Sequence, residues 1–298
     1  MPVAVVTDST AYLPPDLVEK YLIHVVPLYV VLAGHSGREG QDISPADVAR
    51  ALDSRGQVVS TSRPSPGDFV AAYRACLDAG ADRIVSVHLS AELSSTCDAA
   101  RLAASQVGEH LVTVLDSRST AMGAGFPVLA AARAAAAGAG HEEVCDAASA
   151  VAAATRTFFV PDTLEHLRRG GRIGAAAALL GSALAVKPLL HMQEGRVVPL
   201  EKVRTSARAL ARLVQRVTEA AGEDPVDIAV HHLAAPERAE RLAGELRERL
   251  PRLRELYVSE LGPAIGAHVG PGAVGAVVAP SSERAPQDEQ EDAEPPVS

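Results

Sequence analysis

The sequence contains no tryptophan and few other aromatic residues, so that aromatic side chains make up only 3% of its 298 positions. Hydrophobic residues nevertheless account for 47% of the chain and charged residues for 22%, a composition that excludes disorder over most of the length. The core must therefore be built mainly from alanine, valine and leucine, and we expect closely packed, alanine-rich helices.

Cysteine is also scarce. The three cysteines are Cys76, Cys97 and Cys145, and no two of them have the C-x-x-C spacing. An odd number of isolated cysteines indicates neither a disulfide framework nor a zinc site. We therefore predict no bound metal, and we expect the protein to work in a reducing, cytoplasmic compartment.

Uninterrupted apolar runs of membrane-spanning length are missing, because glycine, arginine or proline breaks the longest ones. Residues 1–10 carry no basic export signal and are typical of a buried strand that ends in a polar turn. These features predict a protein that is neither exported nor spans a membrane, and they leave room only for transient membrane contact.

An excess of positive charge is absent too, since the formal net charge is −9. Residues 281–298 supply −5 of it, because six acidic residues face one arginine there, and the body keeps the remaining −4. This balance argues against nucleic acid as a partner. Residues 281–298 have almost no apolar side chain to bury, so we predict a disordered acidic tail.

The first half alternates short apolar runs, suited to buried parallel strands, with helical patterns. The runs lie at 3–6, 25–32, 58–60, 84–89 and 112–115. Two alanine-rich helices, divided by glycines at 138 and 140, follow them. A chain of this length has room for two domains. We therefore predict an N-terminal α/β domain with a parallel, Rossmann-like sheet at residues 1–155.

The second half changes character. Apolar runs at 186–192 and 196–203 are separated by three residues that include a glycine, which is typical of a β-hairpin. Other strand patterns lie at 157–160, 228–232, 256–259 and 273–278. We predict a second α/β domain with a mixed or antiparallel sheet at residues 156–280.

Small hydroxyl-bearing residues follow several of the predicted parallel strands. Thr61 and Ser62 follow one strand, and Ser94 and Ser95 stand at the start of a predicted helix. The carboxyl ends of parallel strands line the ligand crevice of such sheets, and a helix start offers free N–H groups. Helix caps and ordinary turns use the same residue types, but the two sets together favour an anion site.

His268 stands between Gly266 and Gly270, where the backbone can approach a ligand closely and the imidazole can donate a hydrogen bond to an acid. On the residues alone, a structural histidine is the commoner case. His231 and His232 follow an apolar strand, and we interpret them as structural.

Several separated motifs together resemble the DegV family. In chain order they include T-D-S-T at 7–10, V-P-L at 26–28, T-S-R-P-S at 61–65, L-S-S-T at 93–96, G-G-R-I at 170–173, K-V-R at 202–204 and G-P-A-I-G-A-H-V-G-P-G-A at 262–273. They span the chain in family order up to the predicted tail. Each motif alone is weak, and the set is specific.

The resemblance implies a protein that binds one long-chain fatty acid between two domains. The carboxylate would be presented to a separate ATP-dependent fatty acid kinase, which forms an acyl-phosphate for phospholipid synthesis. The chain itself would then be a binding subunit with no catalytic residue, nucleotide site or cofactor. Carried over to this sequence, the residues that bind the carboxylate are Thr61, Ser62, Ser94, Ser95 and His268.

The resemblance also suggests residues with secondary roles. Arg63, Asp8 and Ser9 are expected to assist at the carboxylate; the family usually has glutamine at the position of Arg63 and glycine at that of Ser95. The residues expected to contact the kinase or the phosphate are Arg172, Lys202 and Arg204. We expect Arg172 to reach the partner without lining the apolar pocket.

Two other classes stay open. A serine-dependent lipid ester hydrolase would need a nucleophile, a base and an acid that orients the base, and Ser94, His268 and either Asp8 or Asp116 are residues of these types. No G-x-S-x-G elbow occurs, however. A generic carrier of apolar ligands is the other class. The G-x-G-x-x-G at 270–275 lacks the following helix and acid of a dinucleotide site. The chain length of the ligand and the oligomeric state are not legible from the sequence.

Overall fold

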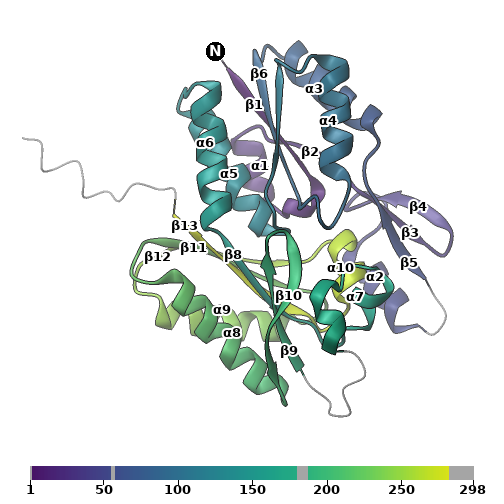
Figure 1. Ribbon diagram of the computed structural model, residues 1–298, viewed down its shortest axis with the longest axis vertical. Helices are drawn as coiled ribbons and strands as arrows, with labels where there is room; N and C mark the ends of the chain where they lie inside the picture. Colours follow the sequence, from purple (N-terminus) through teal and green to yellow (C-terminus); the bar gives the residue numbers. More distant parts are fainter. Residues whose placement is uncertain (1, 55–57, 180–186, 282–298) are drawn as a thin grey trace, which may run out of the picture.

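The computed structural model describes residues 2–54, 58–179 and 187–281. The predicted acidic tail, apart from Ser281, therefore lies outside the described residues. Three sheets form within the described part: a four-stranded parallel sheet, a three-stranded antiparallel sheet and a six-stranded mixed sheet (Figure 1). The parallel first sheet and the mixed last sheet confirm the predicted fold class.

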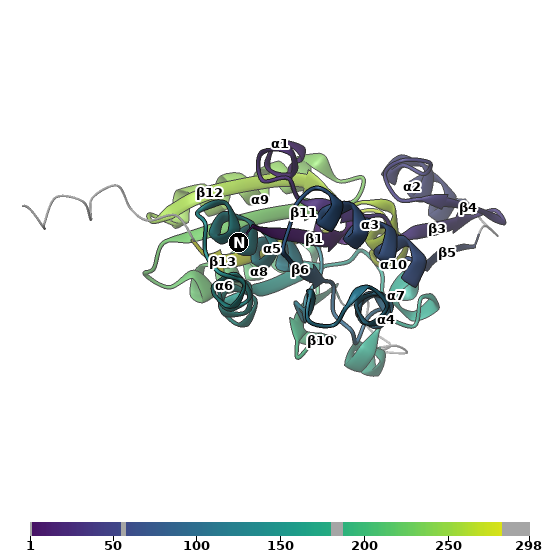
Figure 2. The same cartoon turned by 90° about the horizontal axis from the view of Figure 1, so that it is seen from above.

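The parallel sheet has the strand order β2-β1-β6-β7. Its strands are β1 (Val3–Asp8), β2 (His24–Val26), β6 (Arg83–His88) and β7 (Val112–Asp116). Helices cover both faces (Figure 2): α3 (Pro66–Asp78) and α4 (Thr96–Val107) on one, and α1 (Pro15–Lys20), α5 (Met122–Ala136) and α6 (His141–Ala154) on the other. Because strand side chains alternate between faces, Val6 packs towards α3 and α4 while Val5 packs towards α5.

The start of α3 shows how local sequence sets these elements. Ser65 caps the helix through its hydroxyl, which accepts the backbone N–H of Asp68, and the Asp68 carboxylate accepts the N–H of Ser65 in return. Pro66 occupies the first turn, where its missing N–H costs nothing. These interactions fix the start of α3 at Pro66.

A single strand was predicted over 25–32, but this segment is interrupted at Pro27, where the chain leaves the parallel sheet. β2 ends at Val26, and β3 (Tyr29–Leu32) pairs antiparallel with β4 (His35–Arg38) and with β5 (Val59–Ser62) in a separate sheet. Proline cannot donate to a strand ladder, and the next N–H, of Leu28, donates to Ser9 Oγ at 2.9 Å. The predicted place in the parallel sheet is therefore confirmed for Val25 and Val26 and is wrong for the residues of β3 and β5.

The six-stranded sheet has the order β10-β9-β8-β13-β11-β12. Its strands are β8 (Arg156–Val160), β9 (Lys187–Gln193), β10 (Arg196–Val203), β11 (Val226–His232), β12 (Leu253–Glu260) and β13 (Val274–Pro280). Gln193 pairs with Arg196 across a tight connection, so the predicted hairpin is confirmed. α8 (Ser206–Ala221) and α9 (Pro236–Arg249) pack on one face of this sheet and form a core cluster with it.

The opposite face of the six-stranded sheet meets the first half of the chain. Ala229 and Val277 from that face share an apolar cluster with Met122 and Phe126 of α5. The predicted division between residues 155 and 156 falls at the connection between α6 and β8. Side chains from both sides of it therefore contribute to one core.

Short elements complete the structure and surround the site described below. They are α2 (Pro45–Asp53), α7 (Glu165–Arg169), α10 (Pro263–Val269) and the 3-10 turns η1 (Ser9–Ala11) and η2 (Gly174–Leu179). α2 and α10 cover the three-stranded sheet, with Val48 and Ala264 in the same cluster as Val30. α10 was not predicted, and it carries His268.

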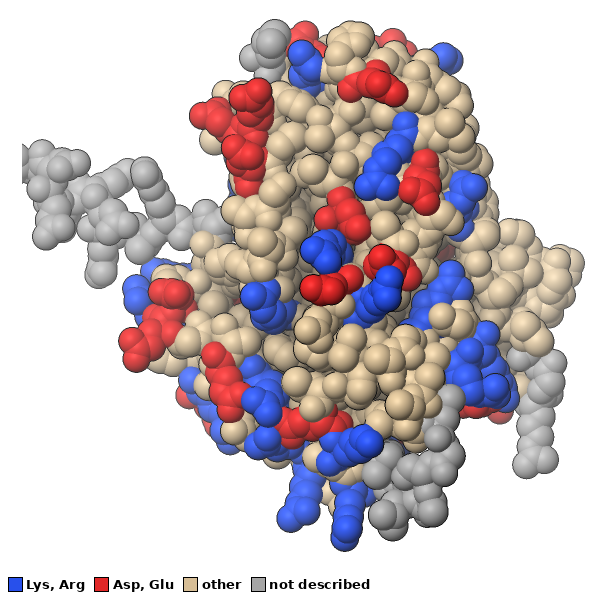
Figure 3. Space-filling model, viewed as in Figure 1, with Lys and Arg blue, Asp and Glu red and all other residues tan. Residues whose placement is uncertain are grey.

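Within the described ranges, no helix is both long and apolar enough to cross a bilayer. No group of three or more histidine, cysteine or acidic side chains in the same ranges is arranged to hold a metal ion. On the face seen in Figure 3, basic and acidic side chains are interspersed, with lysines and arginines gathering towards the lower edge over α8 and β9.

Candidate functional site

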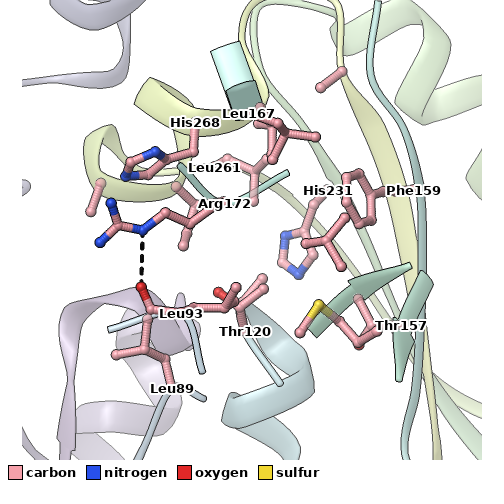
Figure 4. A pocket seen from close by; sticks show the side chains of 18 of the residues that line it. Leu89, Leu93, Thr120, Thr157, Phe159, Leu167, Arg172, His231, Leu261 and His268 are labelled. Carbon is pink, nitrogen blue, oxygen red and sulfur yellow. Dashed lines mark hydrogen bonds between the residues drawn. The ribbon is translucent and has the colours of Figure 1, made fainter. Parts of the chain in front are cut away.

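A largely apolar pocket lies where the connections that follow β6 and β7 of the parallel sheet meet the three-stranded and the six-stranded sheet. Its empty space, including the part open to solvent, is about 950 Å³. Its apolar walls include Leu89 and Leu93 from the first half and Phe159, Leu167 and Leu261 from the second (Figure 4). A concave apolar site with a few converging polar groups is the usual form of a small-molecule pocket.

Polar side chains gather in one part of this wall. They come from β5 and the residue after it, the turn before α4, the turn after α7, and α10, and they are Thr61, Ser62, Arg63, Ser94, Arg172 and His268. The structure thus brings together four of the five residues predicted to bind a carboxylate. The predicted auxiliary residue Arg63 lines the pocket as well.

Thr61 and His268 are hydrogen-bonded across the gap between β5 and α10, with 2.8 Å between Thr61 Oγ1 and His268 Nε2. His268 Nδ1 is buried and has no partner among the described residues. It faces Gly170, where even a Cβ atom would approach it to 2.1 Å. A buried N–H without an acceptor is rarer than an unfilled lone pair, so we place the proton on Nε2, which donates to Thr61. The Thr61 hydroxyl can then donate into the pocket.

The charge state of His268 follows from its surroundings. Burial, and next the nearby Arg172 guanidinium, lower the pKa of His268 to about 4. The imidazole is therefore neutral at pH 7, and the positive charge at this end of the pocket comes from the arginines. A neutral imidazole still has one N–H group, and Thr61 Oγ1 accepts the hydrogen bond that this group donates.

Arg172 lies in the pocket wall, so the prediction that it stands clear of the pocket is wrong. Its Nε donates to the Leu93 carbonyl at 3.0 Å and its Nη1 donates to the Gly170 carbonyl at 2.6 Å (Figure 4). The backbone bonds hold the guanidinium between the turn before α4 and the turn after α7. A fixed cation next to His268 and Leu93 can form a charge-assisted hydrogen bond with an anion.

A buried carboxylate holds the helix that carries His268. Glu39 accepts the Ala264 N–H of α10 at 2.7 Å and the Tyr12 hydroxyl at 2.9 Å, and it also accepts the Ser9 hydroxyl. Burial raises the pKa of Glu39, although these three hydrogen bonds oppose the rise. Ser9, predicted as an auxiliary ligand contact, does not line the pocket; it belongs to this anchor of α10.

The serines before α4 separate into two cases. Ser94 lines the pocket, and its Oγ is 2.9 Å from Thr96 Oγ1. Ser95 occupies the N-cap position of α4, is exposed, and does not line the pocket, so the structure does not support its predicted contact with a carboxylate. Consecutive side chains in a turn point in different directions, and the sequence alone did not distinguish the two.

Asp8, the other predicted auxiliary residue, is sealed inside the parallel sheet. Its carboxylate accepts the Leu89 N–H at 3.1 Å and the His88 Nδ1–H at 2.9 Å, and Thr10 donates to it from both backbone and side chain. His88 Nε2 accepts Ser86 Oγ–H at 2.7 Å, and Ser86 in turn accepts the Tyr73 hydroxyl at 2.9 Å. Asp8 therefore has a structural role away from the pocket.

The geometry does not assemble the hydrolase triad that the residue types allowed. Asp8 is bonded to His88, and Asp116 accepts backbone N–H groups at Ala91 and Arg118. Within the described part of the chain, no hydrogen bond joins Ser94 to His268, which is bonded to Thr61. A nucleophile activated by a base that a third group orients is what the triad requires.

Lys202 and Arg204, predicted to contact a partner, stand apart from the pocket. Both are exposed, at the end of β10 and just after it, and neither lines the pocket. Their side chains are thus available at the surface, unlike that of Arg172.

Three polar pocket residues were missed from the sequence: Thr120, Thr157 and His231. His231 is buried, and burial lowers its pKa to about 4. Its Nε2 accepts the Met122 N–H at 3.2 Å and its Nδ1 is 3.0 Å from Ser259 Oγ, which fits the predicted structural role although the ring also forms part of the wall. No sequence motif marked these positions, because their side chains meet only after the two halves pack.

Comparisons with known proteins agree with this architecture. A sequence model described as an uncharacterised protein of the DegV family matches residues 2–281. A DegV domain-containing protein of Streptomyces coelicolor is 55% identical over 276 residues, which cover 93% of this chain and 98% of that protein.

Solved structures give the same relationship. A DegV family protein from Thermus thermophilus, described for its fatty acid binding, superposes with a TM-score of 0.90 at 34% identity and covers 94% of this chain and 100% of its own. DegV of Bacillus subtilis, described as a fatty acid binding protein, gives a TM-score of 0.85 at 35% identity with the same coverage. These neighbours bind fatty acids and share the fold over nearly all of the described residues. The chain belongs to the DegV family.

Proposed function

We propose that this protein binds one long-chain fatty acid in the pocket, with the carboxylate at the polar part of the wall and the hydrocarbon tail along the apolar part. The observation that carries the proposal is the convergence of Thr61, Ser94, His268 and Arg172 in one part of a largely apolar pocket. The fatty acid binding described for the Thermus thermophilus and Bacillus subtilis relatives supports it.

Each polar group has a defined part in this proposal. The Thr61 hydroxyl accepts a hydrogen bond from the His268 N–H and donates one to the carboxylate. Ser62 and Ser94 add further hydroxyl donors. Arg172 supplies the fixed positive charge and Arg63 a second, exposed one. Hydrogen bonds to a charged group are worth about 1.5–3 kcal/mol each.

The tail supplies most of the affinity. Each CH₂ group removed from water contributes about 0.8 kcal/mol, so a chain of ordinary length gains far more from Leu93, Phe159 and Leu261 than from any one head-group contact. The head group then fixes the orientation of the ligand. A generic apolar carrier would need no such polar cluster.

The proposal extends to a partner. Ser62 and Arg63 are exposed where they line the pocket, so the carboxylate end lies near the surface. The sequence has no G-x-x-x-x-G-K-[ST] phosphate loop, so we propose that a separate, cytoplasmic ATP-dependent kinase phosphorylates the bound acid for phospholipid synthesis. Lys202 and Arg204 offer exposed positive charge for docking it.

Lipid extraction tests the binding proposal directly. Protein purified from a bacterial host is extracted with organic solvent, and the extract is analysed by mass spectrometry; a long-chain fatty acid in near-stoichiometric amount is the expected result. Delipidated protein is then titrated with oleate and palmitate. An empty extract together with no binding of either acid would remove the proposal.

The partner proposal is tested separately. Arg204→Ala is expected to leave oleate binding unchanged and to lower acyl-phosphate formation by the cognate kinase. Arg101→Ala, an exposed arginine of α4 that pairs with Asp98, is the matched control and should leave both unchanged. Equal turnover of the Arg204→Ala variant and the unmodified protein would argue against this docking surface.

A further inference from the structure

One hydroxyl in the pocket wall has unused hydrogen-bonding capacity. Thr120 lines the pocket, and its Oγ1 is buried without a partner among the described residues. The other pocket hydroxyl on this side, Thr157 Oγ1, is 3.0 Å from Ser119 Oγ, and both nitrogens of His231 have partners. Of these three residues, only Thr120 has no side-chain hydrogen-bond partner among the described residues, so both its donor and its acceptor capacity are open to a ligand.

The backbone around Thr120 holds the side chain in place. Ala121, which also lines the pocket, has φ 52° and ψ −145°, a conformation almost confined to glycine. It is fixed from both sides: the Ser119 carbonyl accepts the Ser90 N–H at 2.8 Å, and the Met122 N–H donates to His231 at 3.2 Å. The structure thus maintains an unfavourable backbone geometry at the position where Thr120 faces the pocket.

The position of Thr120 separates it from the polar cluster at the other part of the wall. Figure 4 shows Thr120 beside Leu93 and below His231, whereas Arg172 and, beyond it, His268 lie above Leu93 in the view. Thr120 comes from the connection between β7 and α5, and no hydrogen bond links it to the pair formed by Thr61 and His268 within the described residues. A ligand whose carboxylate is at that pair would pass Thr120 with its chain.

We propose that the pocket takes long-chain acids that carry a hydroxyl or keto oxygen along the chain, with Thr120 as the hydrogen-bond partner of that oxygen. This inference rests on the proposed function and specifies its ligand class. An unsubstituted chain leaves the buried Thr120 hydroxyl without a partner, whereas an oxygenated chain satisfies it. A site with a buried polar group discriminates against a ligand that cannot pair with it.

The test uses delipidated full-length protein, stearate, and a set of hydroxystearates that carry the hydroxyl at successive positions, with affinities measured by calorimetric titration. At least one hydroxystearate should bind about tenfold more tightly to the unmodified protein than to Thr120→Val, since tenfold corresponds to one ordinary hydrogen bond. Stearate should bind Thr120→Val as tightly as, or more tightly than, the unmodified protein.

Two further variants control the experiment. Thr120→Ser keeps the hydroxyl and should bind that hydroxystearate as tightly as the unmodified protein does. Thr218→Val removes a hydroxyl of α8 that is bonded to the Val214 carbonyl at 2.9 Å and does not line the pocket; it should bind every ligand as the unmodified protein does. Melting temperatures identify any variant that does not fold; if Thr120→Val is one of them, Thr120→Ala, which also lacks the hydroxyl, replaces it with the same expected result.

The outcomes distinguish failure of this inference from failure of the proposed function. If Thr120→Val weakens stearate and all hydroxystearates equally, Thr120 contacts the carboxylate and the inference is overturned. If the unmodified protein and Thr120→Val bind each hydroxystearate alike, Thr120 selects nothing and the inference is also overturned. If the unmodified protein binds neither stearate nor any hydroxystearate, it is the proposed function that fails.

Discussion

Two buried polar networks of this protein use similar residue types and differ in how completely they are paired. In the parallel sheet, Asp8, His88, Ser86 and Tyr73 form a continuous chain of hydrogen bonds, and the side chains of His88 and Asp8 are 0% and 1% exposed. In the pocket, the pair formed by Thr61 and His268 opens onto a cavity.

This difference distinguishes a network that stabilises the fold from one that can bind a ligand. The Asp8 network has the connectivity of a serine, histidine and aspartate triad, yet it is sealed and its partners are all internal. In the pocket, Thr120 Oγ1 is buried without a partner among the described residues, and the Thr61 hydroxyl can still donate to a ligand. Buried polar groups are normally paired, so an unpaired hydroxyl that lines a cavity indicates where a ligand completes the network.

The largest effect is expected from breaking the sealed network. Asp8→Ala leaves the N–H groups of Leu89 and Thr10 and the His88 ring without their acceptor, and loss of one partner of a buried charged group typically costs about 3–5 kcal/mol. Urea unfolding should show a fall of this size in the free energy of unfolding. Asp98→Ala, which removes an exposed ion pair with Arg101, should cost less than about 1 kcal/mol. Equal losses for the two variants would show that the sealed Asp8 network stabilises the fold no more than a surface ion pair does.

A smaller effect on folding, together with an effect on binding, is expected at the pocket. Thr61→Val removes the hydroxyl that accepts the His268 N–H and faces the ligand, so oleate affinity should fall about tenfold to a hundredfold. The free energy of unfolding of the lipid-free protein should fall by about 1–3 kcal/mol, less than for Asp8→Ala, because the neutral His268 N–H loses its acceptor. Ser60→Ala, an exposed neighbour in β5 that does not line the pocket, is the matched control. A Thr61→Val variant that unfolds readily and still binds oleate normally would reverse the assignment.

The smallest effect is a pH dependence that belongs to His268. Its folded pKa of about 4 lies below the ordinary value of 6.5, so the folded state binds fewer protons than the unfolded state between these values. The contribution of neutral His268 to the free energy of unfolding is complete above pH 6.5 and is lost as the pH falls towards 4. Between pH 6.5 and 5, lipid-free protein should lose on the order of 1 kcal/mol more stability than His268→Gln does.

Urea unfolding of both proteins at the two pH values measures this difference, and other titrating groups such as Glu39 cancel in the comparison. His110→Gln, at an exposed histidine, should lose as much stability as the unmodified protein. Identical pH dependence of His268→Gln and the unmodified protein would show that His268 is not held neutral by its surroundings.

Features governed by neighbouring residues could be predicted from the sequence. The α3 start at Ser65, the β9–β10 hairpin, the two alanine-rich helices and the buried parallel strands all follow from side-chain periodicity, caps and turn residues. The family motifs also indicated Thr61, Ser62, Ser94 and His268, which line one pocket. Composition and local pattern determine these elements because each depends on contacts within a few residues.

The rest was decided by tertiary packing. The chain leaves the parallel sheet at Pro27. Arg172 lies in the pocket wall because its guanidinium donates hydrogen bonds to the carbonyls of Leu93 and Gly170. Ser95 faces away from the pocket that its neighbour Ser94 lines. The bond at the centre of the site joins Thr61 to His268 across 207 positions of sequence. No local pattern records which way such side chains point, because their partners arrive only when distant segments fold together.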